Sequence, residues 1–291
     1  MSRRAAWVGL AAVAAVVLGC GPGKELPEDI KINDPDEKPI TVPVASEPAA
    51  KEYVARAVKA YAGGKPELVA RGKVSRVVFK GTMMLPADNQ MRPFSATRTM
   101  AAVWHDRIYV NNDLNISGQP LQVRTWLRGP DLTALPEPDQ DNRADLRRSF
   151  PADVTGQYWM GLFVPLADPK AVVFDLQTAN TFFAHSGQTQ EVRQLKLALP
   201  ELPLYQLTFD AKTDRLLRTD YTTKQGVRRR TQWTAMEHKA GPDGLQLPSR
   251  TECRHDGVVV EQWEVEKWEF PEKIDDAEFL PPKADANPPK K

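Results

Sequence analysis

Cysteine is scarce in this sequence, and neither sign of charge is in excess. The 291 residues include only 2 cysteines, which excludes a disulfide-rich scaffold and a four-cysteine zinc site. The 39 lysines and arginines are balanced by 38 aspartates and glutamates, whereas nucleic-acid-binding proteins normally carry a basic surplus. We therefore expect no nucleic-acid partner. Proline, in contrast, is abundant: 25 prolines make up about 9% of the chain, against a usual level of about 5%.

The sequence also lacks the motifs of metal-dependent and nucleophilic catalysis. Its 4 histidines do not fall at metal-binding spacings, and no His-Glu-x-x-His occurs. Ser186 lies in His185-Ser186-Gly187, without the Gly-x-Ser-x-Gly elbow that exposes a nucleophile. The pair Asp275-Asp276 is interpreted as a turn or helix cap rather than an acid/base pair. We expect no enzymatic activity, no metal and no cofactor.

The longest uncharged apolar run, residues 5–18, is only 14 residues long. It follows Arg3 and Arg4 and leads through Val17-Leu18-Gly19 into Cys20. A membrane span needs roughly 18 to 20 apolar residues, so an uncleaved anchor is the weaker interpretation. An ordinary secretory leader cleaved at another position is a second alternative.

This N-terminal pattern resembles a bacterial lipoprotein signal peptide, with an aliphatic residue three positions before the cysteine and a small residue just before it. The resemblance implies that residues 1–19 are removed and that Cys20 receives a diacylglycerol and is then N-acylated. Two or three acyl chains would hold the protein stably on a membrane, whereas one chain is marginal. Gly21 stands where an aspartate would favour inner-membrane retention, so the outer membrane facing the periplasm is expected.

Residues 20–50 are predicted to be a lipidated tether. Six prolines, seven acidic residues and three lysines lie in residues 21–50, without an amphipathic period. Such a stretch buries too little apolar surface to offset its ordering entropy. Residues 283–291 are predicted to be a disordered tail, which leaves residues 51–282 as the folded domain.

The folded domain is predicted to begin with a helix and continue as strands. Tyr53, Val54, Ala57, Val58 and Tyr61 share one helical stripe, which ends before two glycines. A short turn is expected over residues 66–70. The apolar period then changes to two, which predicts strands over the following segments: 77–85, 97–104, 107–111 and 121–128.

The middle and the last third of the domain differ in composition. Residues 139–148 are polar, and we expect a loop or a solvated helix there. Residues 157–166 are apolar on all sides, which indicates a helix that is buried or covers a sheet. The last third alternates between apolar runs and turn signals, which predicts strands over the following segments: 205–209, 215–223, 227–237, 245–255 and 258–270.

The fold class that follows is mainly β, a long curved antiparallel sheet with few helices. In the final strand, Trp263 and Val265 share one face but Trp268 and Phe270 fall on the other. A β-bulge near Glu266 is therefore expected.

The order of elements and the C-terminal motifs resemble the LolA/LolB-like outer-membrane lipoprotein-sorting superfamily. The motifs are Tyr205-Gln206-Leu207-Thr208-Phe209-Asp210, Arg215-Leu216-Leu217-Arg218-Thr219, Leu247-Pro248-Ser249-Arg250 and Ile274-Asp275-Asp276-Ala277-Glu278-Phe279-Leu280-Pro281-Pro282. The resemblance covers residues 51–282 and implies an unclosed half-barrel, with an apolar helix capping a concave face that holds acyl chains. This sequence departs from the family by its acidic tether and proline-rich middle.

Apolar residues of the predicted inner face are the candidate ligand-binding residues, because the concave face of a half-barrel is filled by side chains or by ligand. They are Val77, Phe79, Met83, Trp104, Trp126, Trp159, Phe163, Phe209 and Trp233. The alternative for each is a plain core position. Trp126 shares its face with polar neighbours, so we expect it to be partly exposed.

Two further features have structural interpretations. Arg228-Arg229-Arg230 is expected to form cross-strand pairs with residues such as Glu261 or Glu264, with an anionic-lipid patch as the alternative. Cys253 is expected to be a packed thiol.

Together these observations predict a membrane-anchored envelope lipoprotein that binds or transfers a hydrophobic ligand, either lipid or lipoprotein acyl chains. The alternative is a non-enzymatic envelope scaffold with the same fold and a filled core.

Overall fold

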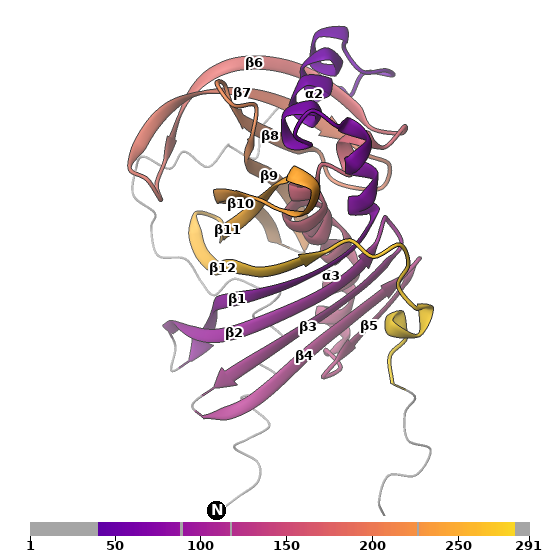
Figure 1. The fold of residues 1–291 in the computed structure, drawn as a ribbon. Coiled ribbons are helices and arrows are strands. Elements are labelled where there is room, and N and C mark those ends of the chain that lie inside the picture. Colours follow the sequence, from indigo (N-terminus) through magenta and orange to yellow (C-terminus); the bar gives the residue numbers. More distant parts are fainter. Residues whose placement is uncertain (1–39, 88–89, 117, 226, 283–291) are drawn as a thin grey trace, which may run out of the picture.

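The structure, a computed structural model, describes residues 40–87, 90–116, 118–225 and 227–282. The predicted leader, Cys20, the first part of the tether and the predicted tail lie outside these residues. The described chain forms one antiparallel sheet of 12 strands in the order β5-β4-β3-β2-β1-β12-β11-β10-β9-β8-β7-β6 (Figure 1). Its two ends, β5 and β6, do not pair with each other, so the predicted curved, unclosed sheet is confirmed.

Neighbouring strands are mostly consecutive in the chain; the exception is β12, which returns to pair with β1. The bounds are β1 Val74–Ala87, β2 Gln90–Val103, β3 Arg107–Ile116, β4 Gln119–Arg128, β5 Asp131–Leu135, β6 Val172–Phe183, β7 Gln188–Ala198, β8 Tyr205–Asp210, β9 Leu216–Gln225, β10 Val227–Ala240, β11 Gln246–His255 and β12 Val258–Glu269.

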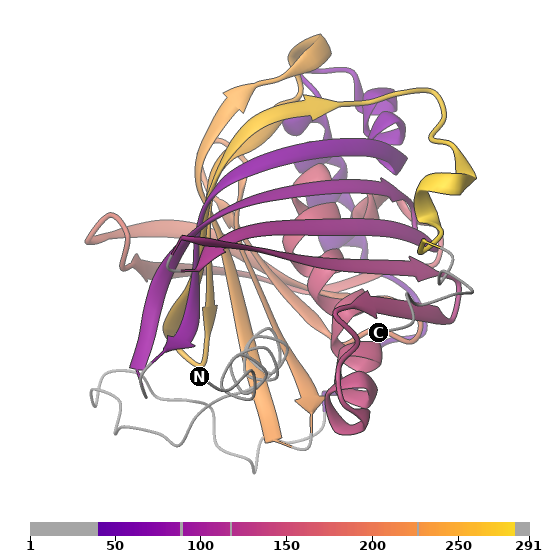
Figure 2. The ribbon, with the colours of Figure 1, turned by 90° about the horizontal axis from the view of Figure 1, so that it is seen from below.

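The helical segments are α2 Pro48–Tyr61, η1 Pro66–Lys73, α3 Gln140–Val154, the π-turn η2 Thr155–Trp159, η3 Met160–Leu162, η4 Pro165–Ala167, η5 Pro242–Gly244 and η6 Asp276–Phe279. The two longest, α2 and α3, lie on the concave side of the sheet (Figure 2). The predicted first helix is confirmed, but it begins at Pro48, within the segment assigned to the tether. The preceding Glu47 donates its backbone N–H to Val173 on β6 at 3.0 Å, and Ala50 is fully buried, so the folded part starts earlier than composition indicated.

The apolar middle segment is buried as expected, but it is not one regular helix. α3 covers the polar residues before it, and the chain then widens into the π-turn η2 and tightens in the 3-10 turn η3 before Phe163, which has a left-handed φ of 60°. Tyr61 of α2 stacks on Phe163 with ring centroids 4.4 Å apart. This stacking ties the two helical segments together over the concave face.

Three strands were not predicted: β5, β6 and β7. β6 is an edge strand whose middle, residues 175–181, is mostly polar and partly exposed, so it lacks the apolar alternation that identified the others. The predicted bulge is confirmed. Val78 pairs with Lys267 while Phe79 pairs with Val265, so that the backbone of Glu266 has no pairing residue on β1. The bulge returns Trp268 to the inner face, where its ring centroid lies 6.2 Å from that of Phe79.

The segment after β12 covers the convex face. Ile274 and Phe279 pack against Ala101 of β2 in a separate small cluster. Asp275 caps η6 by accepting a hydrogen bond from the backbone N–H of Ala277 at 2.9 Å, as the turn-or-cap interpretation predicted. Within the described ranges, no helix combines the length and the apolar character that a membrane crossing requires.

Candidate functional site

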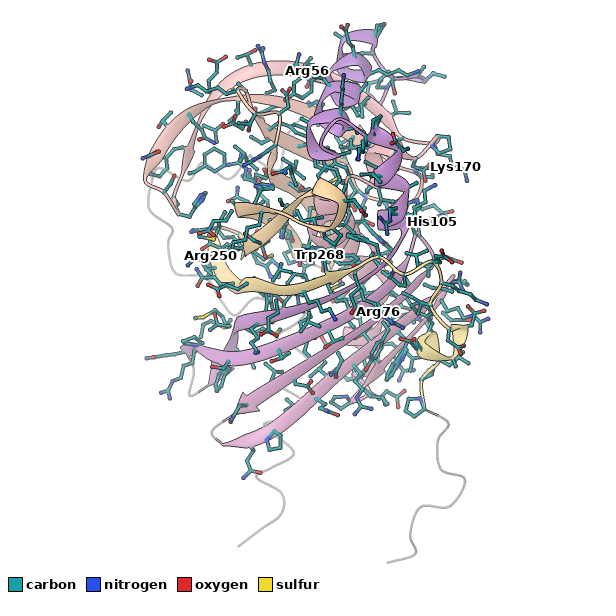
Figure 3. The ribbon with its side chains drawn as sticks, in the orientation of Figure 1. Arg56, Arg76, His105, Lys170, Arg250 and Trp268 are labelled. Carbon is teal, nitrogen blue, oxygen red and sulfur yellow. The ribbon has the colours of Figure 1, made fainter. Side chains whose placement is uncertain are left out.

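A cavity lies in the hollow between the sheet and α3. The space open to the centre of a water molecule is about 110 Å³, because side chains fill most of the hollow (Figure 3). Its apolar wall is formed by residues from both halves of the sheet and from α3: Phe79, Met100, Val110, Val123, Leu146, Phe150, Trp233, Trp263, Val265 and Trp268. We call this space the concave cavity.

The candidate residues divide into four groups in the structure. Phe79 and Trp233 line the concave cavity. Five others are part of the surrounding core and line no described cavity, namely Val77, Met83, Trp104, Phe163 and Phe209. Trp159 is 1% exposed and packs edge-on against Trp104, with ring centroids 4.8 Å apart, but it faces a different space on the far side of α3 and η2.

Trp126 is the candidate that the structure separates from the others. It is only 4% exposed, so the expected partial exposure is wrong. Its ring stacks on Tyr109 at 5.3 Å, and Tyr109 packs with the C-terminal cluster of Ile274 and Phe279 on the convex face. The cover supplied by η6 buries this tryptophan, although its own face carries polar neighbours.

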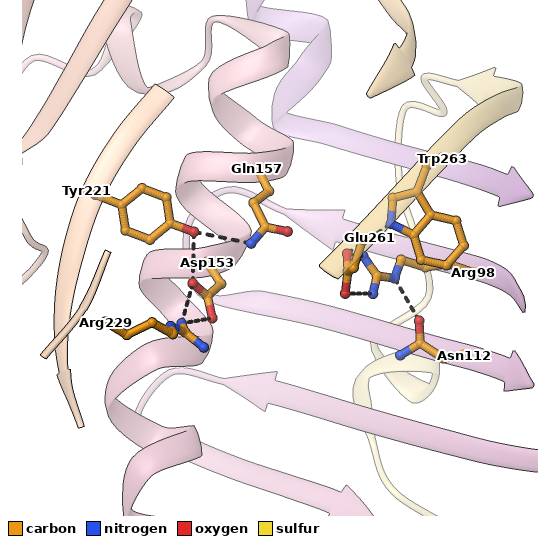
Figure 4. A network of polar contacts seen from close by, with 8 residues as sticks. All are labelled: Arg98, Asn112, Asp153, Gln157, Tyr221, Arg229, Glu261 and Trp263. Atoms are coloured by element: carbon orange, nitrogen blue, oxygen red, sulfur yellow. Dashed lines mark hydrogen bonds and ion pairs between the residues drawn. The ribbon is translucent and has the colours of Figure 1, made fainter. Parts of the chain in front are cut away.

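Two buried ion pairs interrupt the apolar wall (Figure 4). In the first, Arg98 of β2 donates two hydrogen bonds to the Glu261 carboxylate of β12, at 2.9 and 2.8 Å. Arg98 also donates to Asn112 at 2.7 Å and lies 4.4 Å from the centroid of the Trp263 ring. Burial by itself raises the pKa of Glu261, but the charge and hydrogen bonds of Arg98 outweigh it and hold the pKa below the ordinary glutamate value. The pair is therefore charged at neutral pH.

The second pair fixes α3 to the sheet. Arg229 of β10, which is 4% exposed, donates to both oxygens of Asp153 at 2.8 and 2.7 Å. Tyr221 of β9 donates its hydroxyl to Asp153 at 2.8 Å and accepts a hydrogen bond from Gln157 at 3.2 Å. Burial, reinforced by the Asp153 charge, raises the pKa of Tyr221 well above its ordinary value, so this hydroxyl stays a donor.

The expected partners of the arginine triplet were wrong. β10 pairs with β9 and β11, not with β12, so Glu261 is out of its reach and binds Arg98 instead. Within the triplet, Arg229 binds Asp153 and Arg230 binds Asp220 at 3.2 Å. Sequence reasoning missed Arg98 and Asp153, although a single charged residue on the apolar face of a predicted strand could have signalled Arg98.

Other polar groups of the cavity wall are not set up for nucleophilic or metal chemistry. Burial raises the pKa of Cys253 well above its ordinary value, so the thiol is a packed strand residue as predicted. Burial, followed by the Arg229 charge, lowers the pKa of His255. Among the described residues, no three His, Cys, Asp or Glu side chains come together as a metal-binding group.

No family model and no curated protein matches the sequence. Solved structures with a similar course of the chain include a domain described as an outer membrane lipoprotein-sorting protein from Vibrio parahaemolyticus. The two sequences are 10% identical, the TM-score is 0.41, and the alignment covers 79% of this chain and 96% of the Vibrio domain. A LolA superfamily protein from Nitrosomonas europaea has 11% identity, a TM-score of 0.46, and coverage of 80% and 97%. A DUF1329 family protein from Desulfovibrio piger has 12% identity, a TM-score of 0.44, and coverage of 80% and 96%.

Two of these descriptions contain the lipoprotein-sorting and LolA names of the superfamily that the C-terminal motifs resemble. At these identities and TM-scores, the likeness concerns the general course of the chain alone.

Proposed function

We propose that this chain is a cell-envelope lipoprotein that binds a hydrophobic ligand, lipid or lipoprotein acyl chains, in the concave cavity. The observation that carries the proposal is an aromatic and aliphatic cavity held open in the hollow of an unclosed sheet. Ligand sites are typically apolar hollows with a few placed polar groups, and the two ion pairs of this wall fit that description. The activity is binding, with no catalytic step.

The size of the cavity sets how a ligand enters. A cavity of about 150 Å³ holds one benzene molecule, so the concave cavity holds only part of an acyl chain in this conformation. Its wall on the α3 side is formed by Leu146 and Phe150, on a helix whose first turns are polar and exposed. Displacement of this helix is the route by which a longer chain would be admitted.

The same small volume favours one alternative, an envelope scaffold with a filled core. The charged groups of the cavity wall, Arg98, Glu261 and Asp153, are already paired in two arginine–carboxylate contacts, which is also what a purely structural network would show. The two functions differ in one respect: only a carrier retains an acyl ligand through purification.

The proposed location is the outer membrane, facing the periplasm, with Cys20 acylated and no nucleic-acid partner. The basis is the sequence pattern that ends at Cys20 and the glycine that follows it. Fractionation of cells that express Cys20→Ser tests the anchor: the variant should move to the soluble fraction, and a variant that still pellets with membranes would contradict it.

The ligand is tested by native mass spectrometry of the full chain carrying Cys20→Ser. We expect co-purified acyl species on this protein and their loss from the variant that also carries Val123→Trp, because the larger ring fills the cavity from β4. Gln122→Trp is the matched control, since Gln122 is the preceding residue on the opposite, exposed face of the same strand. An empty parent protein that is fully folded would support the scaffold instead.

A further inference from the structure

A second and larger space lies on the other face of α3 and η2. The space open to the centre of a water molecule is about 780 Å³ there. It lies between that helical segment, the turns at Asp106 and Gly129, and the loop that joins β7 to β8. We call it the side cavity. Leu146, Phe150 and Asp153 face the concave cavity, whereas Arg147, Pro151 and Thr155 face the side cavity, so one helix separates the two.

The inner wall of the side cavity combines apolar surface with unused hydrogen-bonding groups. Leu127, Leu132 and Trp159 are all less than a tenth exposed. The indole Nε1 of Trp159 and the hydroxyl of Thr223 are buried and have no hydrogen-bond partner within the described part of the chain. Buried polar groups are nearly always hydrogen-bonded in folded proteins, so these two would bond an oxygen-rich group of a ligand once it displaces the side chains that now cover them.

The rim carries charges of both signs on different elements. α3 contributes Arg147 and Arg148, while loops contribute Asp106 and Glu201. Arg148 is paired with Asp145, and an Asp106 oxygen lies 3.7 Å from Arg107 Nε. Arg147 and Glu201 have no ion pair among the residues that the structure describes. The rim therefore offers one unpaired cation and one unpaired carboxylate, on separate elements beside an apolar hollow.

We propose that the side cavity binds a single-chain zwitterionic amphiphile, the phosphate ester of an amino alcohol that carries one alkyl or acyl chain. The phosphate pairs with Arg147, the ammonium group with Glu201, and the chain lies against Leu127, Leu132 and Trp159. A ligand with only one charge leaves either Arg147 or Glu201 without a partner. A head group without a chain leaves the apolar wall uncovered and lacks the methylene groups whose burial favours binding.

Calorimetric titration of the full chain carrying Cys20→Ser tests this with ligands that share a twelve-carbon tail, each below its micelle concentration. Dodecylphosphocholine should bind at one site about fivefold more tightly than dodecyl phosphate or dodecyltrimethylammonium, and about 25-fold more tightly than dodecyl maltoside, since each exposed charge pair contributes up to about 1 kcal/mol. Free phosphocholine should show no binding. Equal affinity for all four head groups would overturn the proposal.

Variants locate the site. Leu132→Trp, which narrows the cavity from β5 where the chain of the ligand would lie, should weaken dodecylphosphocholine binding. Glu201→Lys should turn the preference toward dodecyl phosphate, and Arg147→Glu toward dodecyltrimethylammonium. Arg143→Glu is the matched control on the same helix, because Arg143 is outside the cavity wall and should leave all affinities unchanged.

Val123→Trp separates this proposal from the function of the concave cavity. It should leave dodecylphosphocholine binding intact whether or not the concave cavity holds acyl chains. Binding that is lost in Val123→Trp and retained in Leu132→Trp would place the amphiphile in the concave cavity and refute the side site.

Discussion

The two cavities on either face of α3 and η2 differ in whether their charged side chains are paired. The concave cavity lies inside the hollow of the sheet, and its charged groups Arg98, Glu261 and Asp153 are held in partly buried arginine–carboxylate pairs through hydrogen bonds of 2.7 to 2.9 Å. The side cavity is larger and has its charges on an exposed rim, where Arg147 and Glu201 lack ion-pair partners among the described residues. Charge in the first therefore supports the fold, whereas charge in the second is free for a ligand.

The largest expected effect is on the pair that holds α3. Asp153→Ala leaves the buried Arg229 guanidinium without its carboxylate and removes the acceptor of the Tyr221 hydroxyl. Removal of one partner of a buried ion pair costs about 3 to 5 kcal/mol of unfolding free energy. Urea denaturation measures the loss.

Asp145→Ala on the exposed face of the same helix is the control for that experiment. Its partner Arg148 is 59% exposed, so the loss should stay below about 1 kcal/mol. If both variants lost the same free energy, the contrast between buried and exposed charge in the two cavities would be wrong.

The second effect is the pH dependence of the Arg98–Glu261 pair. Because the pKa of Glu261 is lower in the folded protein than the ordinary value of 4.5, the pair contributes its full stability above pH 4.5. The contribution is lost as the pH falls through the lowered pKa. Glu261→Gln should cost about 2 kcal/mol at pH 7, and this difference from the parent should shrink steadily below pH 4.5.

Urea midpoints of the parent and of Glu261→Gln at a series of pH values measure this difference. Glu201→Gln at the rim of the side cavity is the comparison and should cost little stability at pH 7, since Glu201 has no ion pair among the described residues. A stability difference between the parent and Glu261→Gln that stays constant from pH 7 to pH 3 would contradict the account of this pair.

The smallest effect concerns an unused hydroxyl in the side cavity. Thr223→Val replaces a buried, unpartnered oxygen by a methyl group of similar shape, which is close to neutral or slightly stabilising. The same change should weaken dodecylphosphocholine binding about twofold to threefold, since one neutral hydrogen bond contributes about 0.5 kcal/mol or more. Thermal unfolding and calorimetry measure the two quantities. A clear loss of stability would show that the hydroxyl has a structural partner.

Much of the fold could be predicted from the sequence because its signals are local. Alternating apolar residues identified most strands. The bulge at Glu266 was located because Trp268 falls on the opposite face from Trp263 and Val265 in a regular alternation. β6 was missed because the edge of the sheet exposes it, and an exposed strand needs no apolar alternation. The start of α2 was missed because burial of Ala50 depends on contacts far along the chain.

The polar part of the site could not be predicted, because it depends on which strands become neighbours. Arg98 and Glu261 are 163 residues apart, and Asp153 and Arg229 are 76 residues apart. Only the return of β12 to β1 and the position of α3 inside the sheet bring these groups together. The burial of Trp126 could not be predicted for the same reason, since the segment that covers it, η6, lies at the far end of the domain in the sequence.

The central claim is that an acyl ligand retained through purification lies in the concave cavity, whereas the side cavity, with its exposed rim, exchanges its amphiphile with the solution. Native mass spectrometry of the full chain with Cys20→Ser, compared with Val123→Trp and Leu132→Trp in the same background, tests it most directly. The account predicts an acyl mass on the parent and on Leu132→Trp, and its absence from Val123→Trp. An acyl mass that survives in Val123→Trp, or that is lost only in Leu132→Trp, would contradict it.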